Sequence, residues 1–242
     1  MAKWISHRGE SYDAPENTLA AFRLSLERGT DGMECDVHLT TDGQVVVGHD
    51  NSTARMGSAI MDIESSTYAE LQKITVSGSL EKVYPGEKIP LLSETFQYLG
   101  EGREYYIELK GSDPALIPAV KKVVEASGIP VRQIVFISFS EELIAGIKKA
   151  MPEYCALWLN SLRTEDGIIG AEALIEKLDS LKVDGIDGWC HPDISKELVD
   201  AVHKAGKIFA VWTVDNPAHA AHLISLGVDA VTSNRAALLK NW

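Results

Sequence analysis

Short apolar runs alternate with segments of helical periodicity along most of the chain. Turn residues follow the runs, which is typical of strands that lead into helices. The runs that we predict to be strands are residues 3–6, 32–37, 105–109, 134–137, 154–159, 183–186, 208–213 and 230–232. The segments that we predict to be helices after them are residues 17–28, 114–126, 141–150, 171–178, 195–205, 218–226 and 236–239. Eight strands, mostly followed by helices, predict a parallel α/β barrel of the (β/α)8 TIM type.

The length of the chain agrees with one such barrel. A TIM barrel usually needs about 250 residues, and this chain has 242, so we expect a single domain over residues 1–242. An open doubly wound sheet is the alternative, but such sheets bind at one switch point, whereas here charged residues end several strands. Residues 51–90 are too long for a barrel loop and hold one short helical stretch near 67–74. We predict a small insertion there, followed by a helix at 93–99.

A β-hairpin is predicted directly after the second strand, where Asp42-Gly43 lies between two alternating apolar stretches. Residues 44–48 would form an extra arm beside the eight barrel strands. With the turn centred on Asp42-Gly43, antiparallel pairing sets residue 36 opposite residue 49, within one or two residues. Asp36 and His49 are then expected to be neighbours, with Cβ atoms roughly 5 Å apart.

Composition limits the partners and the compartment. The net charge is −12 and the pI is near 5.0, so there is no basic field to attract nucleic acid or an anionic membrane. No apolar run approaches the ~20 residues of a membrane span, and the first strand starts almost at Met1, which leaves no room for a signal peptide. We expect a cytoplasmic protein without stable membrane association, unless a removed signal peptide directed it to export or to the periplasm. The oligomeric state stays open.

The three cysteines are Cys35, Cys155 and Cys190. Their odd number and their spacing fit neither a disulfide framework nor a zinc site. Cys35 lies on the apolar face of its strand, so we expect it to pack in the core.

Carboxylates end two of the predicted strands. Glu34 and Asp36 share one face of the second strand, and Glu108 and Lys110 share one face of the strand at 105–109. Carboxylates crowded at a barrel mouth repel one another and lose hydration, so they need a cation. Glu108 and Lys110 alone fit an ion pair equally well, but with Glu34 and Asp36 a divalent metal is favoured. Three oxygen ligands without a thiolate indicate Mg²⁺ or Ca²⁺.

Two histidines, His7 and His49, also lie at strand ends beside these carboxylates. Either histidine alone would more often be structural. Together they form a candidate acid–base pair, each member contributing about 10²–10⁴-fold to a rate. Arg8 and Lys110 add fixed positive charge that can hold a phosphoryl group. These groups predict the cleavage of a phosphoester.

A set of motifs extends this interpretation. They are His7-Arg8-Gly9, Ala14-Pro15-Glu16-Asn17-Thr18, Glu34-Cys35-Asp36-Val37, Asp42-Gly43, His49-Asp50, Pro90-Leu91-Leu92-Ser93-Glu94 and Ile107-Glu108-Leu109-Lys110, with weaker matches at Ile137-Ser138-Phe139 and Val211-Trp212-Thr213-Val214-Asp215. In this order and at these spacings the chain resembles the glycerophosphodiester phosphodiesterase family over essentially its whole length. The resemblance implies a phospholipase-C-like TIM barrel with a small insertion after the second histidine.

The resemblance also implies roles for individual residues. Glu34, Asp36 and Glu108 would bind the metal. His7 and His49 would be the acid–base pair, and Arg8 and Lys110 would contact the phosphate. Glu16 would touch the metal shell or the glycerol, or cap the helix that Thr18 begins, and its position slightly favours capping. Trp212 would lie against the glycerol or the head group, although a place in the barrel core is nearly as well supported.

The reaction implied is hydrolysis of a glycerophosphodiester to glycerol 3-phosphate and an alcohol such as choline, ethanolamine or glycerol. The glycerol 2-hydroxyl would attack phosphorus to form a cyclic phosphate, which water then opens, with His7 as the base and His49 as the acid of the first step. Two alternatives remain: a phosphodiesterase for lysophospholipids, and a barrel that binds glycerophosphodiesters without catalysis. The lack of an apolar flap in residues 51–90 argues against a lipid, and the matched acid and base argue against mere binding.

The chain departs from the family pattern in two places. The family commonly ends its last strand with Thr-Asp-x-Pro, and this chain has Thr232-Ser233-Asn234-Arg235, a loss of the acid that we interpret as structural. Residues 50–56 follow the family pattern loosely on the expected leaving-group side, so the head group stays open. Trp189 and His191 are candidates for that side, with a surface loop the favoured interpretation.

Overall fold

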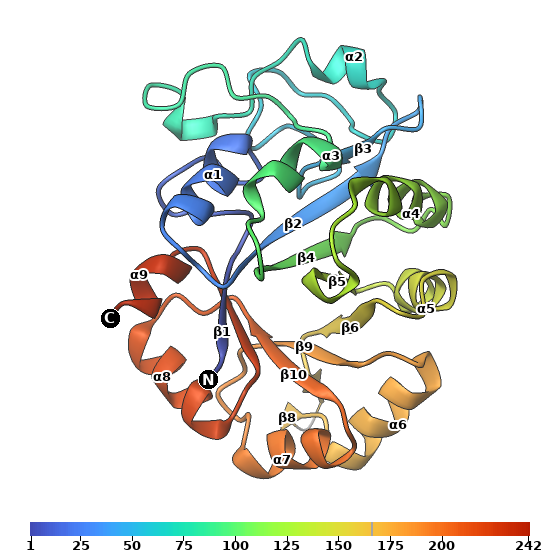
Figure 1. The fold of residues 1–242 in the computed structure, drawn as a ribbon, viewed down its shortest axis with the longest axis vertical. Coiled ribbons are helices and arrows are strands. Elements are labelled where there is room, and N and C mark those ends of the chain that lie inside the picture. The colour runs from blue at the N-terminus through green and yellow to red at the C-terminus, as the bar shows by residue number, and fades with distance from the viewer. Residues whose placement is uncertain (166) are drawn as a thin grey trace.

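The computed structural model describes residues 1–165 and 167–242. Within these residues, eight parallel strands form a closed barrel, as predicted (Figure 1). The strands are β1 (Lys3–Ser6), β2 (Gly32–Leu39), β4 (Glu104–Leu109), β5 (Ile134–Ser138), β6 (Cys155–Asn160), β9 (Gly185–Trp189), β10 (Ile208–Trp212) and β11 (Ala230–Ser233). The barrel closes because β1 pairs with β11 on one side and with β2 on the other.

Helices surround the barrel (Figure 1). They are α1 (Leu19–Glu27), α4 (Leu116–Ser127), α5 (Glu141–Ala150), α6 (Ala171–Leu181), α7 (Lys196–Lys204), α8 (Pro217–Leu226) and α9 (Ala236–Lys240), each within three residues of its predicted bounds. Ser140 and Asn216 cap the N-termini of α5 and α8, where the side chain of each accepts a hydrogen bond from a backbone N–H of the first turn. None of the described helices combines the length and the apolar composition that crossing a bilayer requires.

The hairpin arm is shifted by one residue from its predicted register. The arm is β3 (Val45–Val47), which pairs antiparallel with β2 so that Val37 lies opposite Val47. Asp36 therefore faces Gly48, whose N–H donates to the Asp36 carbonyl at 3.0 Å. The shift arises because the Thr40 N–H still donates to the Gln44 carbonyl, so that three residues form the turn, the last of which is Gly43 at a φ of 75°. This is the three-residue hairpin geometry rather than a two-residue turn. His49 consequently lies in the loop after β3.

The insertion contains little regular structure. Its helices are α2 (Tyr68–Leu71) and the 3₁₀ turn η1 (Gly78–Leu80), and it lies beside β3 (Figure 1). Its apolar side chains form a cluster of their own with Val46 of β3, which consists of Ile63, Leu71, Ile74, Val76 and Ile89. This arm thus joins the insertion to the barrel.

Several short elements differ from the prediction. The helix predicted at 93–99 is divided into α3 (Leu92–Thr95) and the 3₁₀ turn η2 (Phe96–Tyr98). A small hairpin of β7 (Arg163–Thr164) and β8 (Gly167–Ile168), and the 3₁₀ turn η3 (Val131–Gln133), had not been predicted. Segments this short carry too few residues for a periodic pattern.

Two apolar layers hold the barrel and define where the site lies. One layer packs between strands and helices and includes Cys35, which is fully buried as predicted. The other fills the barrel interior and consists of Ile5, Tyr106, Val135, Ile137, Leu157, Leu159, Ala210 and Ala230. The interior positions that follow towards the carboxyl ends of β2 and β4 are charged, and this face of a barrel is where TIM-barrel active sites form.

Candidate active site

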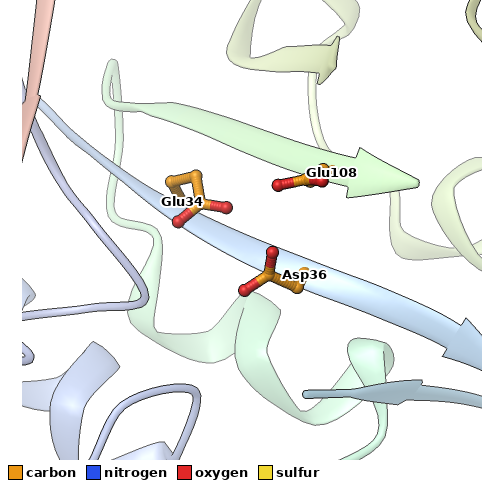
Figure 2. A group of neighbouring side chains, drawn as sticks. All are labelled: Glu34, Asp36 and Glu108. Atoms are coloured by element: carbon orange, nitrogen blue, oxygen red, sulfur yellow. The ribbon is translucent and has the colours of Figure 1, made fainter. Parts of the chain in front are cut away.

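Three buried carboxylates meet at the carboxyl end of the barrel. Glu34 and Asp36 come from the same face of β2, and Glu108 comes from β4, where it pairs in register with Asp36. Figure 2 shows their side chains turned towards one another. One oxygen atom of each lies within 4.8 Å of the others, so the group has the size of a metal site.

Neighbouring residues hold each carboxylate in place. The Asn17 side chain donates to Asp36 Oδ2 at 2.8 Å, and Lys110 Nζ donates to Glu108 Oε1 at 2.9 Å. The backbone N–H of Arg8 donates to Glu34 Oε2 at 2.8 Å. These contacts fix the carboxylates before any ligand arrives, as a metal site requires.

The turn after β1 brings Arg8 to this cluster. Gly9 has a φ of 76°, and a Cβ there would lie 2.5 Å from the backbone of Ala21, so only glycine fits. The turn also points the Arg8 guanidinium into the site, where Nε lies 3.3 Å from Asp36 Oδ2.

The three carboxyls differ in charge. Burial raises the pKa of Glu34 well above its usual range and the pKa of Glu108 to about 8, and the charge of Asp36 adds to both shifts. Burial also opposes ionisation of Asp36, but Arg8 and Lys110 lower its pKa to about 2. Asp36 Oδ1 is buried and has no hydrogen-bond partner among residues 1–165 and 167–242. An oxygen-only cluster with an unpartnered carboxylate oxygen fits a hard divalent cation.

His7 is held in one tautomer by two residues from distant loops. Its Nδ1 lies 2.7 Å from Asn234 Oδ1, and Asn234 Nδ2 donates to Asp215 Oδ2 at 2.6 Å. A carboxylate only accepts, so the Asn234 oxygen must face His7, and Nδ1 must carry the proton. Nε2 is then left as an acceptor. Burial and the charge of Arg8 lower the pKa of His7 to about 4, so the ring is neutral at neutral pH.

His49 has a charged partner instead. Its Nδ1 lies 2.7 Å from Asp50 Oδ1, and Asp50 Oδ2 accepts from Arg55 Nε at 2.8 Å. Burial lowers the pKa of His49, while the charges of Asp36 and Asp50 oppose that shift. The two histidines therefore differ in the partner of their Nδ1, an amide for His7 and a carboxylate for His49.

The favoured expectation for Glu16, helix capping, is wrong. Thr18 caps α1 by accepting from the Ala21 N–H. Glu16 binds two arginines, with Arg8 Nη1 at 2.7 Å and Arg55 Nη1 and Nη2 at 2.6 and 2.8 Å. The short threonine side chain already occupies the cap, and the two guanidinium groups stabilise the Glu16 carboxylate more than a helix end would.

A cavity of about 70 Å³ opens beside the carboxylate cluster. Both histidines, Arg8, Glu34 and Glu108 line one part of it. The rest of the lining consists of Ile137, Phe139, Leu159, Asp187, Trp212, Thr213 and Thr232, so Trp212 belongs to the cavity wall. Neither Trp189 nor His191 is among these lining residues; they lie against each other, with ring centroids 5.4 Å apart.

The rule that strand ends carry the chemistry singled out the carboxylate cluster and both histidines, but several contributors had been missed. They are Asn17, Asp50, Arg55, Phe139, Asp187, Asp215, Thr232 and Asn234. Asn17, Asp50 and Phe139 lie inside motifs already singled out. Asp187 follows a predicted strand by one residue, so the strand-end rule should have found it. Ser233 Oγ, at the position of the acid that the family pattern has, donates to Asp215 Oδ1 at 2.8 Å.

Asp187→Asn is expected to stabilise the fold increasingly as the pH rises. Burial raises the pKa of Asp187 from 3.8 to about 8, so the folded chain keeps a proton that the unfolded chain loses. As the pH rises from about 4 to 8, this group lowers the free energy of unfolding by up to about 1.4 kcal/mol per pH unit. Asparagine does not titrate, so the variant lacks this loss of stability with pH. Thermal melts of both proteins from pH 5 to 8 check this, and a stability difference independent of pH would contradict it.

The sequence is similar to that of known phosphodiesterases. The model of the glycerophosphoryl diester phosphodiesterase family matches residues 7–238. A glycerophosphodiester phosphodiesterase of Bacillus altitudinis is 31% identical over 96% of this chain and 94% of its own length. One of Caldanaerobacter subterraneus subsp. tengcongensis is 28% identical over 98% of this chain and 96% of its own.

The fold is also similar to that of a solved phosphodiesterase structure. The phosphodiesterase of Oleispira antarctica, in complex with the product sn-glycerol-3-phosphate, is similar with a TM-score of 0.89 at 26% identity. The match covers 100% of this chain and 96% of that one. The chain described here therefore belongs to the glycerophosphoryl diester phosphodiesterase family.

Proposed function

We propose that this enzyme, a glycerophosphodiester phosphodiesterase by family, releases glycerol 3-phosphate and an alcohol at a metal site formed by Glu34, Asp36 and Glu108. The observation that carries the proposal is the cluster of these three carboxylates beside a cavity that two imidazoles line together with Glu34 and Glu108. The product bound to the Oleispira antarctica relative is sn-glycerol-3-phosphate, which supports the same product here.

The proposed ion is Mg²⁺ or Ca²⁺, because the donors are carboxylate oxygens. When bound, the ion would withdraw electron density from the phosphoryl group and offset its negative charge. Arg8 and Lys110 border the cluster and would contact the phosphate oxygens. Trp212 would hold the glycerol carbons against its ring.

The first proposed step forms a cyclic phosphate. Nε2 of His7 takes the proton of the glycerol 2-hydroxyl, and that oxygen attacks phosphorus. The bond from phosphorus to the leaving alcohol breaks, and protonated His49 gives its proton to the leaving oxygen. In the second step His49 takes a proton from water, the water oxygen attacks phosphorus, and His7 returns its proton to the 2-oxygen as the ring opens.

The partners of the two rings support this division of roles. Asn234 is neutral and presents an oxygen to His7, which leaves Nε2 of that ring free to accept a proton. Asp50 presents a carboxylate to His49, and a carboxylate stabilises the imidazolium form. The base therefore has the neutral partner, and the acid has the charged one.

Asn234→Asp is expected to move the acidic limb of the pH profile to higher pH. The base must be neutral to act, and a carboxylate beside Nδ1 stabilises its protonated form, so the pKa of His7 should rise by about 1–3 units. Activity would then be lost at a higher pH than in the wild type. Measuring kcat/KM between pH 4 and 8 tests this.

Asn216→Asp is the matched control for this experiment, because Asn216 caps α8 outside the site and aspartate caps equally well. The control should leave the profile in place. An unmoved acidic limb in Asn234→Asp would contradict the role of His7 as the base.

The leaving alcohol is proposed to lie beside His49. A second cavity of about 40 Å³ lies there, with Asp50, Ser52 and Arg55 beside His49 on one side and apolar residues that include Met56 and Ile63 on the other. The charged side chains of Asp50 and Arg55 beside His49 favour a small polar alcohol there.

A substrate panel tests the proposal. The enzyme is incubated with glycerophosphocholine, glycerophosphoethanolamine, glycerophosphoglycerol and lysophosphatidylcholine, with Mg²⁺ or Ca²⁺ present, and the released alcohol and the phosphomonoester, glycerol 3-phosphate or lysophosphatidic acid, are measured. We expect release from the first three substrates. Turnover of lysophosphatidylcholine alone would favour the lipid alternative, and no turnover of any substrate would favour a binding-only barrel.

A further inference from the structure

Two buried polar side chains in the cavity wall are not used by the reaction described so far. Asp187 pairs in register with Leu159 and Ala210, which point into the barrel, so its side chain points inward too. Thr232 pairs in register with the inward-pointing Ile5. Asp187 is 1% exposed and Thr232 is 3% exposed, and both line the cavity.

Both side chains have an unpartnered polar atom. Within the described part of the chain, Asp187 Oδ1 and Thr232 Oγ1 are buried without a hydrogen-bond partner. Buried polar atoms nearly always have a partner, because leaving one unpaired destabilises the fold. Two such atoms in one cavity wall indicate that a polar ligand group completes them.

We propose that Asp187 and Thr232 bind the terminal hydroxyl of the substrate glycerol, the hydroxyl farthest from phosphorus, and thereby select substrates in which it is free. The inference rests on the proposed function. Once the phosphate lies beside Arg8 and the 2-hydroxyl lies at His7, the remaining glycerol carbon must point into the rest of the cavity. That remainder is the wall formed by Asp187, Thr232, Phe139 and Trp212.

The aromatic residues shape this subsite for a small group. Trp212 Nε1 donates to the Asp187 carbonyl at 3.0 Å, which fixes the ring beside the acid. Phe139 packs edge-on against Trp212, with ring centroids 5.4 Å apart. The cavity of about 70 Å³ has room for a short polyol and not for an acyl chain.

The chemistry of Asp187 suits a hydroxyl better than a cationic head group. Burial alone raises the pKa of Asp187 to about 8, so the group is largely protonated at neutral pH. A protonated carboxyl both donates and accepts a hydrogen bond, and a substrate hydroxyl does the same. An acyl ester at that position would remove the donor and would not fit. This enzyme should therefore act on deacylated glycerophosphodiesters.

The test compares two substrates that differ in the terminal hydroxyl alone. They are glycerophosphocholine and its analogue with propane-1,2-diol in place of glycerol, which keeps the attacking 2-hydroxyl. A site that binds a hydroxyl with buried polar groups rejects an analogue without it, and we expect a kcat/KM ratio of about 10²-fold or more for the wild type. Thr232→Val and Asp187→Leu should each lower that ratio at least tenfold.

Controls separate the possible failures. Thr95→Val replaces another buried threonine, at the end of α3, and should keep the wild-type ratio. If Asp187→Leu does not fold, Thr232→Val still tests the subsite. Variants that lower kcat/KM equally on both substrates would overturn the inference. So would variants that change the preference between glycerophosphocholine and glycerophosphoglycerol instead. A wild type that turns over neither substrate would contradict the proposed function itself.

Discussion

His49→Gln is expected to lower kcat for glycerophosphocholine by about 10²–10⁴-fold, the usual contribution of one general acid or base. His49 would protonate the leaving alkoxide, and glutamine has no proton to give at neutral pH. Binding should survive, because the carboxylate cluster and Arg8 are unchanged. Calorimetric titration with glycerol 3-phosphate measures the binding, and steady-state rates measure the catalysis.

A substrate whose leaving group needs no proton tests the role of His49 as the acid separately. Nitrophenolate leaves without protonation, so the first-step release of nitrophenol from a glycerophospho-nitrophenyl ester should suffer far less from His49→Gln than the release of choline. His203→Gln is the matched control, because His203 pairs with Asp229 outside the cavity. If choline release survived in His49→Gln, the assignment of the acid would be wrong.

Asp36→Asn is expected to weaken Mg²⁺ or Ca²⁺ binding by more than about 10²-fold, since loss of even an outer partner of a metal ligand costs 10–100-fold. Arg8 and Lys110 keep Asp36 ionised, and its Oδ1 accepts no hydrogen bond in the described structure. The amide removes the charge and keeps the shape. Calorimetric titration of the free enzyme with each ion measures the loss without reference to activity.

Asp200→Asn serves as the control for that titration, because Asp200 pairs with Lys196 on the exposed face of α7. It should bind the ion as the wild type does. Equal ion affinity in Asp36→Asn and the wild type would remove Asp36 from the metal site.

The barrel was predictable because its signals are local. Strands such as β5 are short continuous apolar runs, and helices such as α5 carry apolar residues at a period of 3.6, so each pattern identifies one element. The register of β3 was predicted one residue off, because Asp42-Gly43 is compatible with both two-residue and three-residue loops. The insertion follows long-range packing around Val46, which no local pattern reveals.

The residues of the site also differ in how far local sequence predicts them. Glu34, Asp36 and Glu108 were found because strand alternation and parallel pairing place them together. Asn234 was missed because it bonds His7 across 227 residues of sequence, through a loop geometry that the last strand alone does not specify. Arg55 was missed for a similar reason, since it reaches Glu16 from the irregular insertion.

We propose above all that the hydrolysis of glycerophosphodiesters at the carboxylate cluster depends on a metal ion. The most direct test of this proposal is glycerol 3-phosphate release from glycerophosphocholine by enzyme treated with a chelator, before and after Mg²⁺ or Ca²⁺ is restored. We expect that release stops with the chelator and returns with one of these ions. Release that continues undiminished in the chelator would contradict it.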